Sequence, residues 1–306
     1  MKKILVATEK PFAAVAVEGI RKVAVEAGYE LVLLEKYTDR TQLLAAVADV
    51  DALIVRSDKI DAEVMDAAKN LKIIVRAGAG YDNIDLKAAT ERGIVVENTP
   101  GQNSNAVAEL VFGLTVMAAR NMYAGTSGFE LKGKHLGIQA FGQVGRNVAR
   151  IAAGFGMEVE ALDPYCPDEV MTAAGVKPVH SITDLYTNNL FVSIHIPATP
   201  ETVGSIGYDL ITSMPKNGVL INTARKEVID EAGLEKALAD RTDIKYVADV
   251  KPGNADALEE KFAGRVFFTP KKMGAQTAEA NINAGLAAAR QSVAFLSEGI
   301  DRFRVN

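Results

Sequence analysis

The chain has 306 residues, of which 48% are hydrophobic and 24% charged, with a net charge of −5. This balance is typical of a globular protein with room for two domains, and the negative charge argues against nucleic acid or an anionic membrane surface as a partner. One cysteine excludes an internal disulfide, and with three histidines no soft-metal site is expected. The first apolar run is too short for a signal peptide, and no run reaches the ~20 residues of a membrane span. A cytoplasmic enzyme is therefore expected.

Strand and helix patterns alternate over the first hundred residues. Short apolar runs predict buried strands at 4–7, 31–35, 52–55, 72–75 and 94–97. Helical patterns lie near 12–27, 41–49, 61–69 and 86–92. Continuous apolar strands separated by helices predict a parallel sheet that is covered on both faces.

A long apolar segment follows the loop NTPGQN at 98–103. Residues 105–121 are apolar on nearly every side apart from Glu109 and the end, which predicts a helix buried all round. We interpret it as the connector between two domains, partly covered by a second subunit. The alternative is a simple core helix within one domain.

The alternation then resumes and predicts a second sheet. Its strands are expected at 136–140, 159–162, 190–196, 218–222, 245–249 and 265–268, and its clearest helices at 144–155 and 231–239. A final helix at 277–297 is long enough to return to the first sheet. The fold class is therefore α/β, with two doubly wound parallel-sheet domains and a cleft between them. We expect one domain at 1–99 plus 281–306, and the other at 100–280.

The second sheet opens with AFGQVG, 140–145, between a strand and a helix. Such a turn aims backbone N–H groups and a helix N-terminus at a pyrophosphate. Gly142 lets the backbone approach the ligand, and Gly145 lets the helix pack close to the strand. Asp163 ends the next strand, where a carboxylate accepts hydrogen bonds from a ribose diol and repels a 2′-phosphate. NAD is therefore expected rather than NADP.

Ala140 stands where the dinucleotide fingerprint has its first glycine. Alanine fits this place only with a negative φ, so we expect the turn to differ slightly. The alternative is an ordinary strand-to-helix turn whose glycines serve packing alone.

Other strand ends carry residues suited to anions and to a nicotinamide. Arg56 with Ser57 suits a phosphate, and successive N–H groups at 77–79 suit a carboxylate. Arg225 is placed to hold a carboxylate and polarise a carbonyl during hydride transfer. Asp249 could bond a nicotinamide carboxamide. Ordinary surface or capping roles are the alternative for each.

Five segments occur in the order and spacing of one family. They are VRAGAGYDNID (75–85), AFGQVG with Asp163, SIHIPATPETVGSI (193–206), NTARKEVID (222–230) and TPKKMGAQT (269–277). Together they resemble the D-2-hydroxyacid dehydrogenase family, and VRS at 55–57 is most similar to its phosphoglycerate branch. The resemblance implies a flavodoxin-like substrate domain, a Rossmann NAD-binding domain and a homodimer.

The resemblance also assigns roles to particular residues. Arg225 is implied to be the catalytic arginine, Asp249 to orient the nicotinamide, and Asp163 to hold the adenosine ribose. Cofactor contacts are implied for Gly142, Gln143, Val144, Gly145, His195, Pro197, Thr223, Ala224, Gly274 and Ala275. Substrate contacts are implied for Arg56 and Ser57 with a phosphate, and for Ala77, Gly78 and Ala79 with a carboxylate.

The chain departs from the family at its acid/base pair. The family pattern TPH-x-GA reads TPKKMGA here, and the partner glutamate is replaced by Asn254. A lysine has an ordinary pKa near ~10.4, which a carboxylate would raise and a neighbouring cation would lower. Losing the glutamate therefore suits a lysine acid/base near Arg225. Aligned from the Gly-Ala side this is Lys272, which we favour; aligned from the Thr-Pro side it is Lys271.

The expected reaction is NAD-dependent oxidation of 3-phospho-D-glycerate to 3-phosphohydroxypyruvate, which feeds serine biosynthesis. One alternative is a reductase of glyoxylate, hydroxypyruvate or another 2-keto acid; another is a non-catalytic NAD-binding sensor. The chain ends at DRFRVN, where longer members of this branch add regulatory domains. Feedback inhibition by serine through such a domain is therefore not expected.

Overall fold

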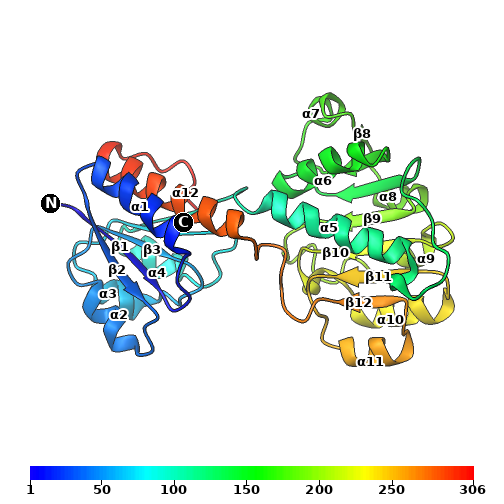
Figure 1. Ribbon diagram of the computed structural model, residues 1–306, viewed down its shortest axis with the longest axis horizontal. Helices are drawn as coiled ribbons and strands as arrows, with labels where there is room; N and C mark the ends of the chain where they lie inside the picture. The colour runs from blue at the N-terminus through cyan, green and yellow to red at the C-terminus, as the bar shows by residue number, and fades with distance from the viewer. The chain divides into compact units, whose positions relative to one another are not determined.

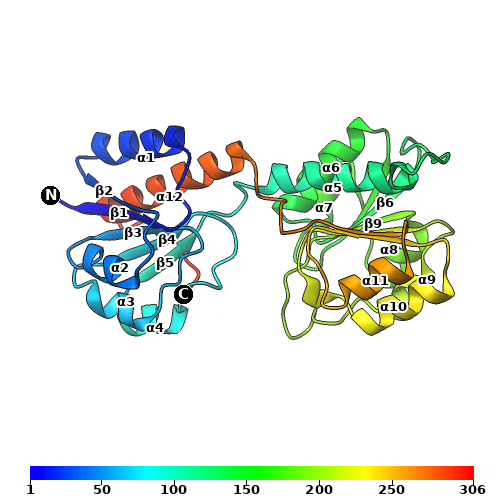
Figure 2. The same cartoon turned by 60° about the horizontal axis from the view of Figure 1, so that its bottom comes forward.

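The computed structural model describes residues 1–306, which divide into two compact units (Figures 1 and 2). Unit 1 contains Met1–Asn103 and Thr277–Asn306, and unit 2 contains Ser104–Gln276. Each unit is built around one parallel sheet with helices on both faces. This confirms the predicted class of two parallel-sheet α/β domains.

The sheet of unit 1 has the strand order β2-β1-β3-β4-β5. Its strands are β1 (Lys3–Thr8), β2 (Glu30–Glu35), β3 (Ala52–Val55), β4 (Ile73–Arg76) and β5 (Val95–Asn98). All neighbouring strands run parallel. The order reverses between β1 and β3, and ligands of such sheets bind outside the carboxyl ends of the strands near that reversal.

Two layers of helices cover this sheet, as Figure 2 shows. The helices are α1 (Ala14–Glu26), α2 (Arg40–Ala46), α3 (Ala62–Ala67), α4 (Leu86–Glu91) and α12 (Ala278–Glu298). Helix α12 packs on α1, β3 and β4, whereas α2, α3 and α4 cover the other face. Aspartates cap three of these helices: Asp39, Asp61 and Asp85 accept hydrogen bonds from first-turn N–H groups of α2, α3 and α4.

The sheet of unit 2 has the order β12-β11-β10-β9-β6-β7-β8. Its strands are β6 (His135–Gln139), β7 (Glu158–Leu162), β8 (Lys177–Pro178), β9 (Phe191–Ile194), β10 (Val219–Asn222), β11 (Lys245–Ala248) and β12 (Val266–Phe268). The order reverses between β6 and β9, which places the switch point beside the glycine turn. Strand β8 was not predicted, because two residues carry no periodic pattern.

Helices again lie on both faces of this sheet (Figure 2). They are α5 (Ser104–Ala119), α6 (Gln143–Gly154), α7 (Asp168–Ala173), α8 (Ile182–Asn188), α9 (Tyr208–Ser213), α10 (Glu231–Asp240) and α11 (Ala255–Lys261), with short 3₁₀ turns η1 (Asn121–Tyr123) and η2 (Lys226–Val228). Helices α5, α6 and α7 share one core with the sheet, and α8 to α11 share the other. None of the helices combines the length and apolar character needed to cross a membrane.

Helix α5 is not covered on all sides within this chain. It packs on α6, β10 and β11 through residues such as Val111 and Phe112. Asn105, Glu109 and Gly113, each four positions apart, form an exposed stripe. The predicted burial of this helix included cover by a second subunit, so the exposed stripe of the single chain does not test it.

Candidate active site

The glycine turn joins β6 to α6 and leaves the start of α6 without a side-chain cap. Gly142 is the N-cap residue and carries no acceptor, so the first N–H groups of α6 have no side-chain partner. Ala140 has a φ of 79°, which corrects the expectation of a negative value. Its N–H donates to the carbonyl oxygen of Leu162 at 2.9 Å, and this contact with β7 holds the unfavourable angle.

The two glycines of the turn have different surroundings. A Cβ at Gly145 would lie 2.3 Å from the carbonyl oxygen of Ala140, so the helix approaches the strand too closely for any side chain. A Cβ at Gly142 would meet nothing within 4 Å. The space above Gly142 is therefore open to a ligand, and the space at Gly145 is filled by the protein.

The carboxylate of Asp163 lies beside this turn. Its Oδ2 accepts a hydrogen bond from the Phe141 N–H at 2.8 Å, and its Oδ1 accepts one from the Tyr165 N–H at 2.9 Å. Each oxygen keeps a further lone pair for another donor. Tyr165, two residues after Asp163, is 95% exposed.

His195 follows β9 at the same edge of the sheet. The ring Nε2 of His195 shares a hydrogen bond with the Ser193 hydroxyl at 2.9 Å. The backbone N–H of His195 donates to the carbonyl oxygen of Gln139. Desolvation lowers the pKa of His195 to about 3, so the imidazole is neutral at physiological pH. Pro197 lies two residues further and is exposed.

The loop after β10 carries Thr223, Ala224 and Arg225. The Asn222 side chain shapes it, because Oδ1 accepts from the Ala224 N–H and Nδ2 donates to the Arg225 carbonyl oxygen, both at 2.9 Å. The hydroxyl oxygen of Thr223 is buried without a hydrogen-bond partner. A buried unpartnered hydroxyl is costly, and a bound ligand would offer it a partner.

Lys272 and Arg225 meet at one oxygen atom. Arg225 Nη1 donates to the carbonyl oxygen of Ala224 at 3.0 Å, and Lys272 Nζ donates to the same oxygen at 3.3 Å. Lys271 is exposed and makes no hydrogen bond or ion pair. Of the two candidate lysines, the structure therefore brings Lys272 to Arg225.

Asp249 follows β11 and is almost completely buried, with 1% of its surface exposed. Its carboxylate accepts hydrogen bonds from the segment that carries the two lysines, including Gly274. Gly274 is itself buried, and Ala275 is half-buried. Asn254, at the expected glutamate position, begins α11 and places its Nδ2 3.5 Å from the Glu231 carbonyl oxygen.

In unit 1, Arg56 is held by the chain around it. Its guanidinium donates to the carbonyl oxygens of Lys10 and Pro11 at 2.9 and 3.0 Å, and to Asn281 Oδ1 at 2.7 Å. It also lies 5.2 Å from the ring centre of Phe12. Burial lowers the pKa of Arg56 below its usual value, but guanidinium groups stay charged in proteins. Ser57 beside it is exposed.

The predicted nest at 77–79 is not formed by three free N–H groups. The Ala77 N–H donates to the Val55 carbonyl oxygen and the Gly78 N–H to the Arg76 carbonyl oxygen, both at 2.8 Å. The Ala77 hydrogen bond continues the parallel pairing of β4 with β3, and the Gly78 hydrogen bond closes a tight turn. Only the Ala79 N–H is left for a carboxylate.

Arg76, at the carboxyl end of β4, was not among the predicted site residues, but its guanidinium lies over the glycine-rich loop. A Cβ at Gly78 would lie 1.4 Å from Arg76 Nη1, so the guanidinium occupies the space that glycine leaves open. Its Nε donates to the Arg56 carbonyl oxygen at 3.0 Å. A basic residue at the carboxyl end of β4, directly before the glycine-rich loop, was a signal that could have identified it.

Two parallel α/β sheets, one of them with a glycine turn and an acidic strand end at its switch point, define a dinucleotide-binding class of fold. The family model described as "D-isomer specific 2-hydroxyacid dehydrogenase, catalytic domain" matches residues 5–306, so the chain belongs to this family.

Several relatives are similar over most of the chain. D-3-phosphoglycerate dehydrogenase of Methanocaldococcus jannaschii is 38% identical over 274 residues, covering 82% of this chain and 51% of that protein. Hydroxypyruvate reductase of Thermotoga maritima is 36% identical over 279 residues, covering 84% and 88%. The chain thus spans about half the length of the phosphoglycerate dehydrogenases that it matches.

Solved structures are also similar over the whole chain. One of them is the NAD⁺-bound 3-phosphoglycerate dehydrogenase of Entamoeba histolytica, with 47% identity and a TM-score of 0.88, and the match covers 100% of this chain and 98% of that one.

Proposed function

We propose that the chain catalyses NAD-dependent oxidation of 3-phospho-D-glycerate to 3-phosphohydroxypyruvate. The observation that carries the proposal is the meeting of Lys272 and Arg225 at the Ala224 carbonyl oxygen. The similarity to phosphoglycerate dehydrogenases, one of them with NAD⁺ bound, supports it. In this proposal unit 2 binds the cofactor and unit 1 recognises the substrate.

The residues of the glycine turn fit a dinucleotide. The open space at Gly142, the uncapped N–H groups of Gln143 and Val144, and the acceptor oxygens of Asp163 suit a pyrophosphate and a ribose. The negative charge of Asp163 disfavours a 2′-phosphate. Bound NAD would supply the hydride acceptor for the reaction.

Lys272 and Arg225 divide the remaining chemistry. As the hydride leaves C2, a neutral Lys272 amine takes the proton of the substrate hydroxyl, and the C2–O bond becomes a carbonyl. Arg225 donates hydrogen bonds to the developing carbonyl oxygen and to the substrate carboxylate.

In addition to Arg225, we propose that residues of unit 1 bind the two anionic groups of the substrate. Arg56 with Ser57 is proposed for the phosphate, since three of the five N–H donors of the guanidinium are used within the chain. Arg76 and the Ala79 N–H are proposed for the carboxylate. In this proposal the Arg76 guanidinium supplies the hydrogen bonds that the Ala77 and Gly78 N–H groups were predicted to give, because those two groups already bond to the backbone.

Formation of NADH from 3-phosphoglycerate tests this function directly. Turnover with 3-phosphoglycerate well above that with unphosphorylated glycerate is expected. The similarity to hydroxypyruvate reductase favours a second candidate, reduction of a 2-keto acid. Arg56→Gln separates the two, because it should lower kcat/KM for the phosphorylated substrate by about 10²-fold and leave glyoxylate nearly unaffected.

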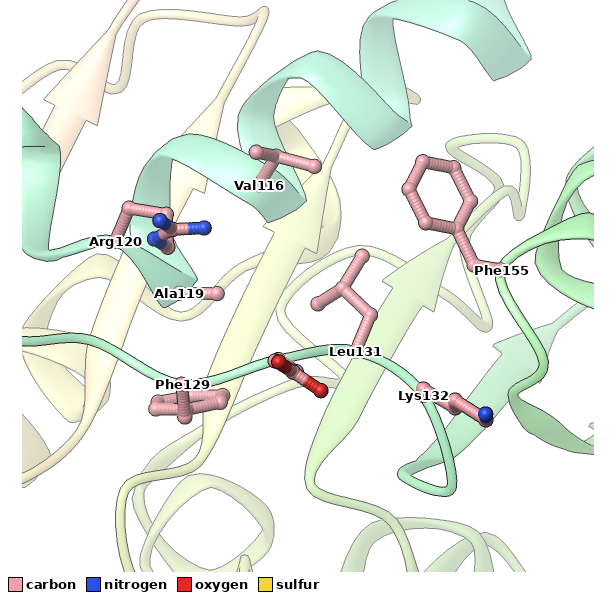
Figure 3. A pocket seen from close by; sticks show the side chains of 8 residues that line it. Val116, Ala119, Arg120, Phe129, Leu131, Lys132 and Phe155 are labelled. Carbon is pink, nitrogen blue, oxygen red and sulfur yellow. The ribbon is translucent and has the colours of Figure 1, made fainter.

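We also propose that the enzyme is a homodimer that uses the open side of α5. A hollow of about 270 Å³ lies at the end of this helix (Figure 3). Val116, Leu131 and Phe155 line it, and Phe155 is 40% exposed. Burying this apolar surface in a second copy would remove it from water. Light scattering of Gly113→Arg, in the exposed stripe, should show a monomer where the wild type is a dimer.

A further inference from the structure

The segment with the two lysines is fixed by one buried carboxylate. We name residues 269–274 the lysine loop. Asp249 Oδ1 accepts hydrogen bonds from the Thr269 hydroxyl at 2.9 Å and from the Met273 N–H at 2.6 Å, and Oδ2 accepts one from the Gly274 N–H at 2.8 Å. The carboxylate thus holds both ends of the loop.

The loop is packed as closely as its backbone allows. A Cβ at Gly274 would lie 3.0 Å from Asp249 Oδ2 and 3.2 Å from a methyl carbon of Val107, so only glycine lets the N–H reach the carboxylate without a shift. At the other end, Thr269 is 5% exposed and its N–H donates to the Ala248 carbonyl oxygen at 3.0 Å. Both ends of the loop are therefore bonded to the protein, whereas residues 270–273 between them are exposed.

A neutral side chain could not replace this carboxylate. An ionised carboxyl group accepts on both oxygens, whereas an asparagine has one acceptor oxygen and an NH₂ group that would face an N–H. Hydrogen bonds to an ionised acceptor are about twice as strong as neutral ones. A buried charge is costly unless it is bonded, and the three donors of the lysine loop supply those bonds.

We propose that Asp249 is a positioning residue that holds the lysine loop, so that the Lys272 amine stays at the Ala224 carbonyl oxygen beside Arg225. It acts on the reaction through the loop. This inference rests on the proposed function and differs from the carboxamide contact that the family resemblance implies for Asp249. Holding the loop and contacting the carboxamide can be tested separately. The Thr269 hydroxyl belongs to the loop and bonds Asp249, so changing it removes a loop contact without changing Asp249 itself.

Hydrogen exchange of the Met273 and Gly274 amides tests the contact without any turnover. In Asp249→Asn, we expect both amides to exchange at least about tenfold faster than in the wild type, since hydrogen bonds to charged groups are lost. Unchanged exchange in a folded variant would overturn the proposal. Because no substrate is present, this result stands even if the proposed reaction fails.

Thr269→Val and Thr269→Ser test the consequence for catalysis. Valine keeps the shape of threonine and removes its hydroxyl, whereas serine keeps the hydroxyl. Thr269→Val should lower kcat for 3-phosphoglycerate by about tenfold, shift the kcat–pH profile and leave the NAD Kd within about twofold. Thr269→Ser should restore most of kcat. A raised NAD Kd with unchanged kcat in Thr269→Val would show that the network serves the cofactor and would overturn the proposal.

Discussion

Lys272 and Arg225 donate hydrogen bonds to the same acceptor, the carbonyl oxygen of Ala224, at 3.3 and 3.0 Å. An amine and a guanidinium that share one acceptor lie close enough for each charge to influence the other. The arrangement brings together a candidate base from the loop after β12 and a candidate carbonyl-polarising group from the loop after β10, two strands of one sheet with β11 between them. It is the structural basis of the first two predictions.

Replacing Lys272 by alanine should lower kcat for 3-phosphoglycerate oxidation by about 10²–10⁴-fold, the usual contribution of a general base. Lys271→Ala is the matched variant and should retain most of the activity, because both lysines are exposed but only Lys272 bonds to the Ala224 carbonyl oxygen. Steady-state NADH formation measures both. Equal losses in the two variants would contradict the assignment of the base to Lys272.

Replacing Arg225 by lysine keeps the positive charge and removes the planar pair of donors. We expect kcat/KM to fall by about 10²–10³-fold, because a single ammonium cannot bond carboxylate and carbonyl oxygens in the same geometry. Lys226→Ala is the control, since Lys226 is the exposed neighbour of Arg225. A normal kcat/KM in Arg225→Lys would exclude the bidentate role.

Asp163→Ser should weaken the binding of NAD and reduce the preference of the protein for NAD over NADP. The loss of a charged acceptor for ribose hydroxyls should raise the NAD Kd by about tenfold or more, and the NADP Kd should fall relative to it. Glu169→Gln removes a nearby exposed charge and should leave both Kd values unchanged. Fluorescence titration with each cofactor gives the ratio; an unaltered ratio in Asp163→Ser would contradict this role.

Gly145→Ala should change the stability of the protein, whereas Gly142→Ala should change its affinity for NAD. A methyl at Gly145 would meet the Ala140 carbonyl oxygen at 2.3 Å, so this variant should be destabilised, and thermal unfolding should show a lower Tm. Gly142 has a φ of −73° and open space, so Gly142→Ala should keep the wild-type Tm and bind NAD more weakly. Tight NAD binding by Gly142→Ala would show that the pyrophosphate lies elsewhere.

Glu97 gives a pH dependence of stability. It is 1% exposed, its Oε1 accepts from the Phe303 N–H, and burial raises the pKa of Glu97 above its usual 4.5. The folded protein therefore binds the Glu97 proton more tightly than the unfolded chain does. The stability that this bound proton contributes is lost as pH rises through the folded-state pKa of Glu97.

Glu97→Gln should consequently be more stable than the wild type at pH 7, by roughly 2–4 °C in Tm if the buried charge costs about 1 kcal/mol. The difference should shrink as pH falls towards 4.5. Glu91→Gln, at an exposed position of α4, should show no such pH-dependent gain. A gain that is constant with pH would show that ionisation of Glu97 is not its cause.

Local pattern was enough to place the strands of both sheets, apart from β8. Runs such as 52–55 and 219–222 are apolar without interruption because both faces of a parallel sheet are buried, and that pattern is present in the sequence itself. The glycine turn and Asp163 were predicted together for the same reason, since a dinucleotide site requires them at a fixed spacing along the chain. Asp163 does lie beside the turn, bonded to the Phe141 N–H.

The errors occurred where a distant neighbour decides the outcome. Ala140 adopts a positive φ because Leu162 holds its N–H, and the N–H of Ala77 is used by Val55 on the adjacent strand. Neither partner is visible in the local sequence.

The sequence by itself determined the two-sheet α/β class, the glycine turn and the residue types available for anion binding and proton transfer, because periodicity and spacing are properties of a short stretch of chain. Only the tertiary structure decided that Lys272 meets Arg225, that Arg76 lies over Gly78, and that Asp249 holds the lysine loop. Hydrogen-bond partners are chosen by proximity and direction in space, and folding brings together groups that are far apart along the chain.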